Sequence, residues 1–557
     1  MRCSRRLIVL AGLGAWFSAR CALAASPLAE AETLYADWLD ATYALATVRA
    51  GPADVRDGRD AGAWSRERDR DAALLATRLD ALKAVRLGAA DRAALKAMRQ
   101  GLAEAPTTPA AAAPGESEAR CRGAADARLE REPLSQALYA CFEHYGNHLE
   151  FEGGTIARTT ALELLQELDT SARRAALLRA FAPLWNALAP ADANGPYRRL
   201  IRLAAADQAA HGNSPIAAAA RTVGAPERDV EGWLVAVLAR WGRAIDPTPV
   251  EPWDYWHRHT AATRVLDPEI GAGRILELTK RYYLDLGADL DALGVEHDLA
   301  IRPGKAPLAY ADFVRIGREV DGRWRPAIAR VSANVEKGGL FVLNEIVHED
   351  GHAVHMAAVR TRPAYFDLGD DLFIEAFADV TSWSVAEPAW QRRYLGHAVD
   401  ESGALEALYT GVVLDAAWGL FELRMLRAPD SDPNAVWTDI TSRYLHVVPH
   451  PELPWWALRV QLVDLPGYMI NYGLGAVLTA DLRDRTRRAI GSFDAGNPRW
   501  YAWTSEHLLR FGKSRPTPTL LNAFLGRPVS TRALIAELNR IRPPRQGLSA
   551  SRRRALP

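Results

Sequence analysis

The residues His348-Glu349-Asp350-Gly351-His352 form an H-E-x-x-H pattern, in which the two histidines are four positions apart. On an α-helix these two positions share one face, so both imidazoles can bind the same metal ion. Imidazole nitrogen is a good ligand for Zn²⁺. Glu349 is rotated by about 100° from His348, so it can reach a water at the ion without binding the ion. The spacing predicts a zinc site with Glu349 as general base.

A catalytic zinc site needs a third protein ligand and keeps its fourth position for water. A proline and a glycine interrupt residues 360–371, and residues 373–379 then begin a new helical stretch. Glu375 in this stretch is the candidate third ligand. Asp379 lies one turn later on the same face, where it can accept a hydrogen bond from a ligating imidazole. The predicted ligands of one Zn²⁺ per chain are His348, His352 and Glu375.

Three other histidines are weaker candidates for metal ligands. His144 and His148 have the same spacing, but no glutamate follows the first histidine and Gly146 interrupts the helix. His355 lies one turn beyond His352, where packing or support of a ligand is its expected role. The alternative for the H-E-x-x-H motif itself is a pair of surface histidines on an amphipathic helix.

The elements that position these residues are expected to be mainly helical, because Ala, Leu, Arg and Glu recur at helical spacing. The predicted helical stretches are 29–50, 69–100, 159–192, 196–222, 228–243 and 271–293. Short extended segments are expected at Arg330–Val335 and Gly339–Val342, with ordinary loops as the alternative. An edge strand beside the motif helix could hold a peptide by strand addition.

No internal repeat or long linker divides the chain. This favours one large, mainly α domain over residues 25–540, with two lobes around a cleft, over several modules. Residues 541–557 are rich in arginine and proline and are expected to form a flexible basic tail.

The first 24 residues have the features of a secretory signal peptide. Arginines precede the apolar run Leu7–Phe17, and Ala22-Leu23-Ala24 matches a cleavage site. We therefore expect cleavage before Ala25 and a periplasmic or secreted protein. A membrane anchor is the alternative, but the apolar run is too short to span a bilayer, so no anchor is expected after cleavage.

Charge and cysteine content refine this expectation. The 557-residue chain carries 68 Lys and Arg against 68 Asp and Glu, so its formal charge is zero. Zero net charge argues against a general nucleic-acid binder. Cleavage would remove Cys3 and Cys21 and leave Cys121 and Cys141. In an oxidising compartment this pair suggests a disulfide, with two buried free thiols as the alternative.

The segments HEDGHAVH and FIEAFADVTSWSVAEP resemble the zinc core of two related gluzincin-type peptidase families. These are the angiotensin-converting enzyme (peptidyl-dipeptidase) family and the thimet oligopeptidase and oligopeptidase F family. Asp379-Val380 favours the first and His355 favours the second. The resemblance is specific over residues 341–390 and weaker over 405–480. It implies a large two-lobed helical fold, a deep cleft that admits short peptides, and a very small β element near the zinc helix.

The resemblance also implies downstream tyrosines that donate a hydrogen bond to the oxyanion formed at the scissile carbonyl. Tyr472 matches the family position best, and Tyr468 lies one turn earlier. A phenol suits this role because it is protonated at neutral pH. The alternative is two ordinary core or rim tyrosines. Both families carry a histidine shortly upstream, where this chain has Gln461; the nearest histidines are His446 and His450.

Together these features predict zinc-dependent hydrolysis of peptide bonds in short peptides, by a peptidyl-dipeptidase or an oligopeptidase. One alternative is a catalytically inactive peptide-binding protein that retains the fold, because the upstream histidine is missing. Another is an unrelated zinc hydrolase that acts on a different amide. Arg459 and Arg483 are the cations available to hold a substrate's terminal carboxylate, and the sequence alone places neither.

Overall fold

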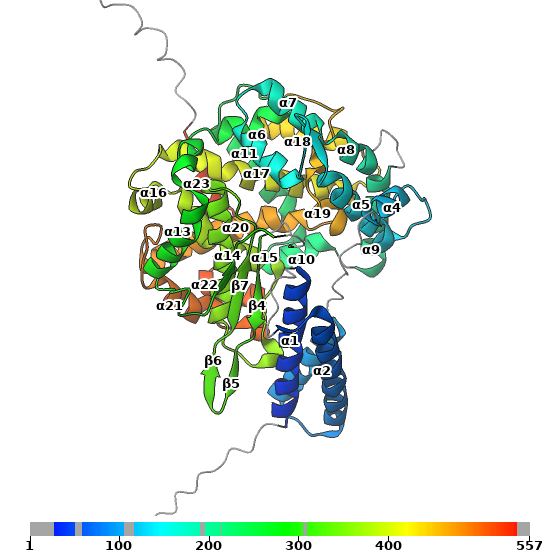
Figure 1. Cartoon of the computed structure of the whole chain (residues 1–557), viewed down its shortest axis with the longest axis vertical. Helices are drawn as coiled ribbons and strands as arrows, with labels where there is room; N and C mark the ends of the chain where they lie inside the picture. Colours follow the sequence, from blue (N-terminus) through cyan, green and yellow to red (C-terminus); the bar gives the residue numbers. More distant parts are fainter. Residues whose placement is uncertain are drawn as a thin grey trace, which may run out of the picture.

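The computed structural model describes residues 27–50, 58–104, 116–189, 195–212, 214–302, 305 and 309–542. The predicted signal peptide, residues 1–24, lies outside this part of the chain, as does the predicted basic tail beyond residue 542. The described residues form a rounded helical body from which an N-terminal helical layer extends at one end (Figure 1).

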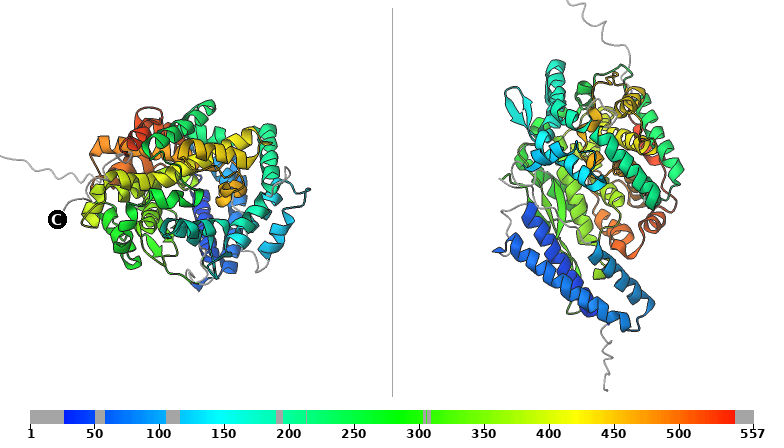
Figure 2. Two further views of the ribbon diagram at one scale, coloured as in Figure 1. Left: turned by 90° about the horizontal axis from the view of Figure 1, so that it is seen from above. Right: turned by 90° about the vertical axis from the view of Figure 1, so that its right-hand side faces the viewer.

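The N-terminal layer consists of α1 (Ala29–Ala50), α2 (Ala61–Ala81) and α3 (Ala89–Ala103). Helices α1 and α2 run side by side as a hairpin, which Figure 2 shows from the side. This layer has two small hydrophobic clusters in addition to the large core of the body. One surrounds Trp38 and Leu75 and also includes Ala364 of the body, and the other surrounds Trp64. The layer is therefore a partly independent packing unit.

Aromatic packing and ion pairs attach this layer to the body. The ring of Tyr43 lies 5.1 Å from that of Phe313 in the sheet of the body. Arg362, between the helices Leu340–Ala358 and Asp371–Ser382 of the body, pairs with Glu32 at 2.7 Å and with Asp91 at 3.0 Å.

Within the residues that the structure describes, twenty α-helices build the body, and strands β3–β7 lie between the tenth and the eleventh of them. The first ten are α4 (Glu116–Gly123), α5 (Arg131–Gly146), α6 (Arg158–Glu167), α7 (Ser171–Arg179), α8 (Ala182–Leu188), α9 (Pro196–His211), α10 (Pro215–Val223), α11 (Val230–Ala244), α12 (Tyr255–His259) and α13 (Ala272–Asp285). The second ten are α14 (Leu340–Ala358), α15 (Asp371–Ser382), α16 (Pro388–Tyr394), α17 (Glu401–Arg427), α18 (Pro433–Leu445), α19 (Gln461–Asp464), α20 (Met469–Ile490), α21 (Trp500–Thr504), α22 (Thr517–Leu525) and α23 (Arg532–Leu538).

The β structure is small and lies mainly beside α14 (Figure 1). A three-stranded sheet has the order β3-β7-β4, in which β7 pairs in parallel with β3 and antiparallel with β4. Two hairpins, β1–β2 and β5–β6, complete the strands. Their bounds are β1 Leu149–Phe151, β2 Gly154–Ile156, β3 Glu296–Asp298, β4 Tyr310–Arg315, β5 Arg318–Val320, β6 Arg323–Arg325 and β7 Ile328–Ser332.

The strand predictions near the motif are half correct. Residues 330–332 do lie in a strand, but this strand, β7, is the central one of its sheet rather than an edge. The prediction of an extended segment at Gly339–Val342 is wrong, because Leu340 begins α14. Gly339 supplies the turn before the helix with φ of 111°, a backbone conformation that glycine adopts without steric cost.

Several of the predicted helical stretches contain more than one helix, because helix caps divide them. The stretch 159–192 is three helices, because Thr170 caps α7 and Pro183 lies in the first turn of α8. The stretch 196–222 is two, because Gly212 ends α9 in the left-handed conformation and Ser214 caps α10. The stretch 69–100 likewise contains the end of α2 and most of α3.

Helices α17 and α20 cross closely in the centre of the body. A Cβ at Gly419 would lie 3.0 Å from the carbonyl oxygen of Met469, so a larger residue would push the helices apart. Beside this crossing, the Glu422 carboxylate accepts a hydrogen bond of 2.8 Å from the Met469 N–H at the start of α20. Helix α17 is long and apolar enough to span a membrane, but 67% of its most apolar window is buried inside the protein, as in a core helix.

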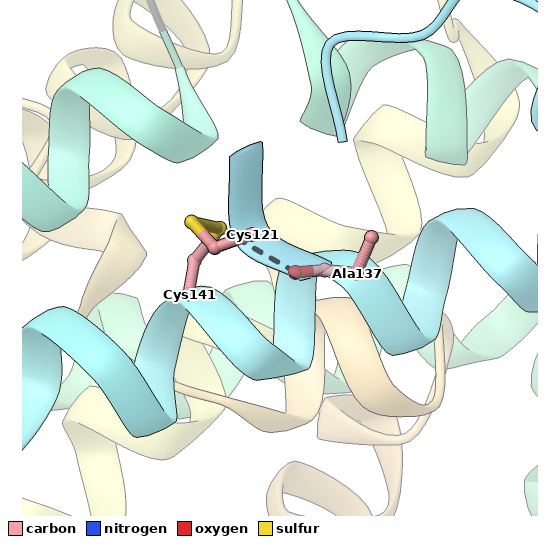
Figure 3. Close-up of a disulfide and its surroundings, with 3 residues drawn as sticks. All are labelled: Cys121, Ala137 and Cys141. Atoms are coloured by element: carbon pink, nitrogen blue, oxygen red, sulfur yellow. Dashed lines mark hydrogen bonds between the residues drawn. A yellow bond between two sulfur atoms is a disulfide. The ribbon is translucent and has the colours of Figure 1, made fainter. Parts of the chain in front are cut away.

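Cys121 and Cys141 form a disulfide that joins α4 to α5 (Figure 3). Their Cα atoms are 4.6 Å apart, which is within the usual range for such a bond. Helix α4 begins at Glu116, and the disulfide fixes this short helix to the longer α5.

Removing the disulfide should destabilise the protein. Its two cysteines are 20 residues apart, and closing a loop of that length restricts the unfolded chain by about 3 kcal/mol. We expect the double substitution Cys121→Ser and Cys141→Ser to lower the midpoint of urea denaturation accordingly. The difference from wild type should vanish when both proteins are measured with a reducing agent. Equal midpoints without reductant would contradict the prediction.

The stability contribution of Glu422 should depend on pH. Burial raises the pKa of Glu422 to about 8, although backbone N–H groups partly oppose the shift. A glutamate in the unfolded chain has a pKa of about 4.3. Between these values the folded protein holds a proton that the unfolded chain releases, so this contribution falls as pH rises, by up to about 1.4 kcal/mol per pH unit.

The substitution Glu422→Gln tests this dependence because it removes the titrating group. We expect the variant to gain stability relative to wild type as the pH rises from about 5 to about 8, measured as the midpoint of urea denaturation. The exposed Glu277→Gln serves as the control. A difference between Glu422→Gln and wild type that stays constant with pH would refute the assignment.

Candidate metal centre

Helices α14 and α15 form the candidate metal centre because they pack in close contact. A Cβ at Gly351 would lie 2.8 Å from the Cα of Ala378 and 2.9 Å from its carbonyl oxygen. The glycine within the H-E-x-x-H motif therefore permits the approach of the two backbones. On the other side, the Tyr283 hydroxyl donates to the carbonyl of Val347 at 2.7 Å and lies 2.8 Å from the Thr381 hydroxyl. This tyrosine therefore contacts both α14 and α15.

The three predicted ligands converge in this arrangement. The ligand atoms of His348, His352 and Glu375 all lie within 4.8 Å of one another, and no other such group occurs among the residues that the structure describes. The Nε2 atoms of the two histidines are 3.1 Å apart, and Nε2 of His348 lies 3.5 Å from Oε2 of Glu375. Ligands placed tetrahedrally at about 2.0–2.1 Å from zinc are about 3.3 Å apart, so these donors fit one Zn²⁺.

Asp379 orients one of the ligands. Its Oδ1 lies 2.8 Å from Nδ1 of His348 and also accepts a hydrogen bond of 3.1 Å from the Ser382 hydroxyl. A proton on Nδ1 then leaves the lone pair of Nε2 directed at the other ligands, as in a carboxylate–histidine–zinc arrangement. Asp379 thus lies where the sequence predicts it.

Two of the three donors are already in the protonation state that metal binding requires. For His348, burial lowers the pKa, but the charge of Asp379 and the hydrogen bonds with Asp379 and Glu375 raise it well above the ordinary value, so a metal ion must displace one of its protons. Burial lowers the pKa of His352 to about 4, and the charge of His348 adds to this shift, so His352 is a neutral imidazole at pH 7. Burial works against a charge on Glu375, but its hydrogen bond with His348 brings the pKa below the ordinary value. The site therefore combines a neutral nitrogen ligand with a carboxylate, a donor set typical of catalytic zinc.

Glu349 lies on α14 between the two histidines in sequence and is 7% exposed. Burial raises the pKa of Glu349 to about 7; among the surrounding charges, Glu375 raises this pKa and His348 lowers it. A carboxyl group with a pKa near neutrality can both accept and release a proton at pH 7. This environment suits the role of general base that the motif predicts.

A buried pair behind the motif was missed by the sequence reasoning. Asp350 is fully buried, and its Oδ1 lies 2.9 Å from Nε2 of His297 in strand β3. The contact joins the sheet to α14 directly beside the metal ligands. An aspartate inside an otherwise apolar helix face is the signal that could have revealed it, because a buried carboxylate requires a partner.

Tyr468 and Tyr472 lie at the start of α20, with ring centroids 5.7 Å apart. For both phenols burial raises the pKa, to about 12 for Tyr472, and the charge of Glu375 is the next contribution. Both phenols are thus close enough to the metal centre to respond to a ligand carboxylate, and both stay protonated at neutral pH. A protonated phenol can donate a hydrogen bond, so their role as donors to a reacting carbonyl stays a prediction.

Gln461 is in the stretch where both families carry the upstream histidine, and it contacts Tyr472. The Gln461 side chain interacts by hydrogen bonding with the Tyr472 hydroxyl. His446 instead bonds the carbonyl of Gly242, and His450 bonds Glu251 and Glu452. Neither histidine belongs to the metal centre, whereas Gln461 occupies a position beside its tyrosine.

The two candidate arginines have different surroundings. Arg459 forms an ion pair with Asp415 of α17, and both charges act on the pKa of Tyr472. Arg483 is buried and binds Asp494, the Ser384 hydroxyl and the carbonyl of Val380. Arg459 is therefore the one of the two that lies beside the candidate centre.

The remaining histidines show no ligand geometry. His355 is 1% exposed and lies between the rings of Phe373 and Phe377, with centroid distances of 5.5 and 5.3 Å. Burial lowers the pKa of His355 to about 3, so it packs as a neutral side chain. The rings of His144 and His148 are 6.0 Å apart at the end of α5, and they belong to no group of three metal-binding side chains in the described part of the chain.

A comparison with solved structures identifies a protein of similar fold. No protein-family model and no curated protein sequence matches the chain. The crystal structure of the M32 carboxypeptidase from Deinococcus radiodurans R1 matches with a TM-score of 0.50 and 15% sequence identity, over 92% of this chain and 97% of the carboxypeptidase chain. This likeness singles out neither of the two families whose zinc core the motifs resemble. The chain has the mainly helical fold of that metallopeptidase, as the sequence predicts.

Proposed function

We propose that the protein is an exported zinc metallopeptidase that hydrolyses peptide bonds in short peptides. The observation that carries this proposal is the convergence of His348, His352 and Glu375 around one point, with Glu349 buried next to them. An inactive peptide-binding protein would not need to retain the buried base. The disulfide supports export, because such bonds persist in oxidising compartments.

His348, His352 and Glu375 would hold the zinc ion. When bound, Zn²⁺ polarises the scissile carbonyl and lowers the pKa of water at the site. Asp379 holds the imidazole of His348 in the orientation that ligation requires. Glu349 takes the proton of the attacking water and then donates a proton to the leaving amine nitrogen, a sequence that its pKa of about 7 allows at neutral pH.

Tyr472 and Tyr468 donate hydrogen bonds to the oxygen of the reacting carbonyl as negative charge develops there. Gln461 holds the Tyr472 hydroxyl in place. The contribution of preorganised donors of this kind to catalysis is about 10²–10³ in rate.

Strand β4 is the part of the sheet best suited to hold the substrate backbone. It is an edge strand in the order β3-β7-β4, and it contacts α14. An extended peptide can pair with such an edge through main-chain hydrogen bonds. The predicted strand addition thus moves from β7 to β4, because both sides of β7 are already paired.

Arg459 favours cleavage near the carboxyl terminus of the peptide, because a guanidinium beside Tyr472 can bind a terminal carboxylate. The likeness in fold to a carboxypeptidase agrees with this mode. An oligopeptidase that cuts internally is the alternative. A library of short peptides, with product ends identified by mass spectrometry, distinguishes the two modes.

Metal binding is tested directly on the purified protein. We expect about one zinc per chain by elemental analysis, and we expect a chelator to remove both the metal and any peptide hydrolysis. His348→Ala and Glu375→Ala should abolish zinc retention, whereas Asp379→Ala should weaken zinc affinity by about 10- to 100-fold. The pair His144→Ala and His148→Ala is the matched control and should bind zinc normally. Full zinc content in His348→Ala would exclude the proposed site.

The general base is tested by Glu349→Gln. We expect zinc to remain bound and kcat/KM for a cleaved peptide to fall by about 10²–10⁴, because the amide cannot accept the proton of water. The exposed Glu277→Gln should cleave at the wild-type rate. Hydrolysis at an unchanged rate in Glu349→Gln would show that this mechanism is wrong. A wild-type protein that binds zinc and peptides but cleaves none would favour the inactive peptide-binding alternative.

A further inference from the structure

A cavity of about 310 Å³ lies between α4, α5, α8 and the start of α9. Cys121 forms part of its wall, at the point where the disulfide joins α4 to α5 (Figure 3). None of the residues that line the cavity belongs to α14, α15 or α20, so the cavity is separate from the candidate metal centre. Sites for small molecules have volumes of about 300–1,000 Å³, and this cavity is large enough for a small one.

The lining of the cavity carries positive charge and no negative charge. It contains Arg122 and Arg199 but no aspartate or glutamate. Arg122 pairs with Glu118 one turn earlier on α4, so its charge is balanced. Arg199 forms no ion pair with any residue that the structure describes. The side chain of Asp126, whose backbone carbonyl binds Arg199, is itself paired with Arg128 at 2.8 Å.

Backbone carbonyls hold the guanidinium of Arg199 in a fixed position. Its Nη1 donates a hydrogen bond of 3.3 Å to the carbonyl of Ala124, and its Nη2 donates one of 2.7 Å to the carbonyl of Asp126. These bonds use two of the five N–H donors of the group. The remaining donors are available to an anion in the cavity, because a fixed guanidinium binds carboxylate or phosphate oxygens with little further ordering.

Two neutral polar side chains, those of Tyr145 and Asn186, also line the cavity. Neither forms a hydrogen bond with another residue in the described part of the chain. A hydroxyl and an amide can both donate to an anion. In addition, Pro196 and Arg199 belong to the first turn of α9, a 16-residue helix without an acidic residue in that turn. The positive end of the helix dipole therefore adds to the charge of Arg199.

The chemistry of the lining defines the class of ligand. One unpaired cation suits a monoanion better than a phosphate dianion. Because the lining contains no carboxylate, it offers no partner to the ammonium group of a free amino acid. The residues other than the four polar ones are small and mainly apolar: Cys121, Ala124, Ala125, Ala187, Gly195 and Pro196. They can contact a short apolar body attached to the anionic group.

We propose that this cavity is a binding site for a small organic monocarboxylate. Arg199 pairs with the carboxylate, Tyr145 and Asn186 donate hydrogen bonds to it, and the small apolar residues contact the rest of the ligand. The disulfide holds the walls that α4 and α5 contribute at a fixed separation, which lowers the entropic cost of binding. The proposal does not depend on the proposed peptidase function, because the site shares no residue with the metal centre.

Four probes test the ligand class by calorimetric titration of the full protein: phenylpropanoate, its neutral amide phenylpropanamide, phenylalanine and inorganic phosphate. We expect phenylpropanoate to bind saturably at one site per chain, with an affinity about 10- to 100-fold above that of each other probe. Tighter binding of phosphate would identify an inorganic-anion site and overturn the proposal. Equal binding of the carboxylate and the amide, or no saturable binding of phenylpropanoate up to about 10 mM, would also overturn it.

Variants of the lining test its place in the fold. Arg199→Gln should weaken the binding of phenylpropanoate by about 10- to 100-fold, and Tyr145→Phe by about 2- to 10-fold. Because Arg199→Gln also removes two bonds to the backbone, Ala187→Leu is a second test: it fills the cavity, keeps Arg199, and should weaken binding as strongly. The matched control is Arg274→Gln on α13, since Arg274 also bonds a backbone carbonyl, that of Glu269, and should bind normally. Unchanged binding in both Arg199→Gln and Ala187→Leu would exclude this cavity.

A carboxylate can also bind a zinc ion, so the metal centre is tested separately. The variant His348→Ala, which is expected to lose zinc, should bind phenylpropanoate as tightly as the wild type. Loss of binding in His348→Ala, with normal binding in Arg199→Gln, would assign the carboxylate to the metal centre and overturn the proposal.

Discussion

The close packing of α14 against α15 is the constraint on which the rest of the centre depends. The two helices are in contact at Gly351 and Ala378, and a Cβ at position 351 would meet backbone atoms of Ala378. This approach brings Glu375 from one helix to the histidines of the other, and it places Asp379 behind His348. Tyr283 and the pair of Asp350 and His297 hold α14 from its remaining sides. The ligands are therefore fixed by rigid elements on several sides, as precise metal geometry requires.

Burial strengthens the interactions of these polar groups, and the free-energy cost of burying each group is offset in a different way. The carboxyl of Glu349 responds by a pKa near neutrality, whereas Asp379 and Asp415 retain partners in His348 and Arg459. Each of these two acids is thus paired with a basic group beside the candidate centre.

Much of the centre could be predicted because its information is local. The motif spacing on one helix, and a glutamate on the next, identify His348, His352 and Glu375 without knowledge of the fold. The helix 29–50 was predicted with its observed bounds, since no cap interrupts its periodicity. Partners far apart in the chain could not be predicted, because no local pattern encodes them: Arg158 bonds a carbonyl 300 positions away, and His297 meets Asp350 only through the sheet. The division of 159–192 into three helices depended on the Thr170 cap and on Pro183, two local signals that the helical periodicity alone does not include.

The attachment of the N-terminal layer has a consequence for how the protein responds to its medium. The layer packs around two small clusters, one of which includes Ala364 of the body, and ion pairs such as those of Arg362 join it to the loop between α14 and α15. Screening by salt weakens ion pairs that are partly accessible to solvent, as these are, but leaves apolar packing largely intact. Ionic strength therefore acts on the joint between layer and body more than on either unit. The joint lies beside strand β4, so ionic strength also acts on how closely α1 covers that strand.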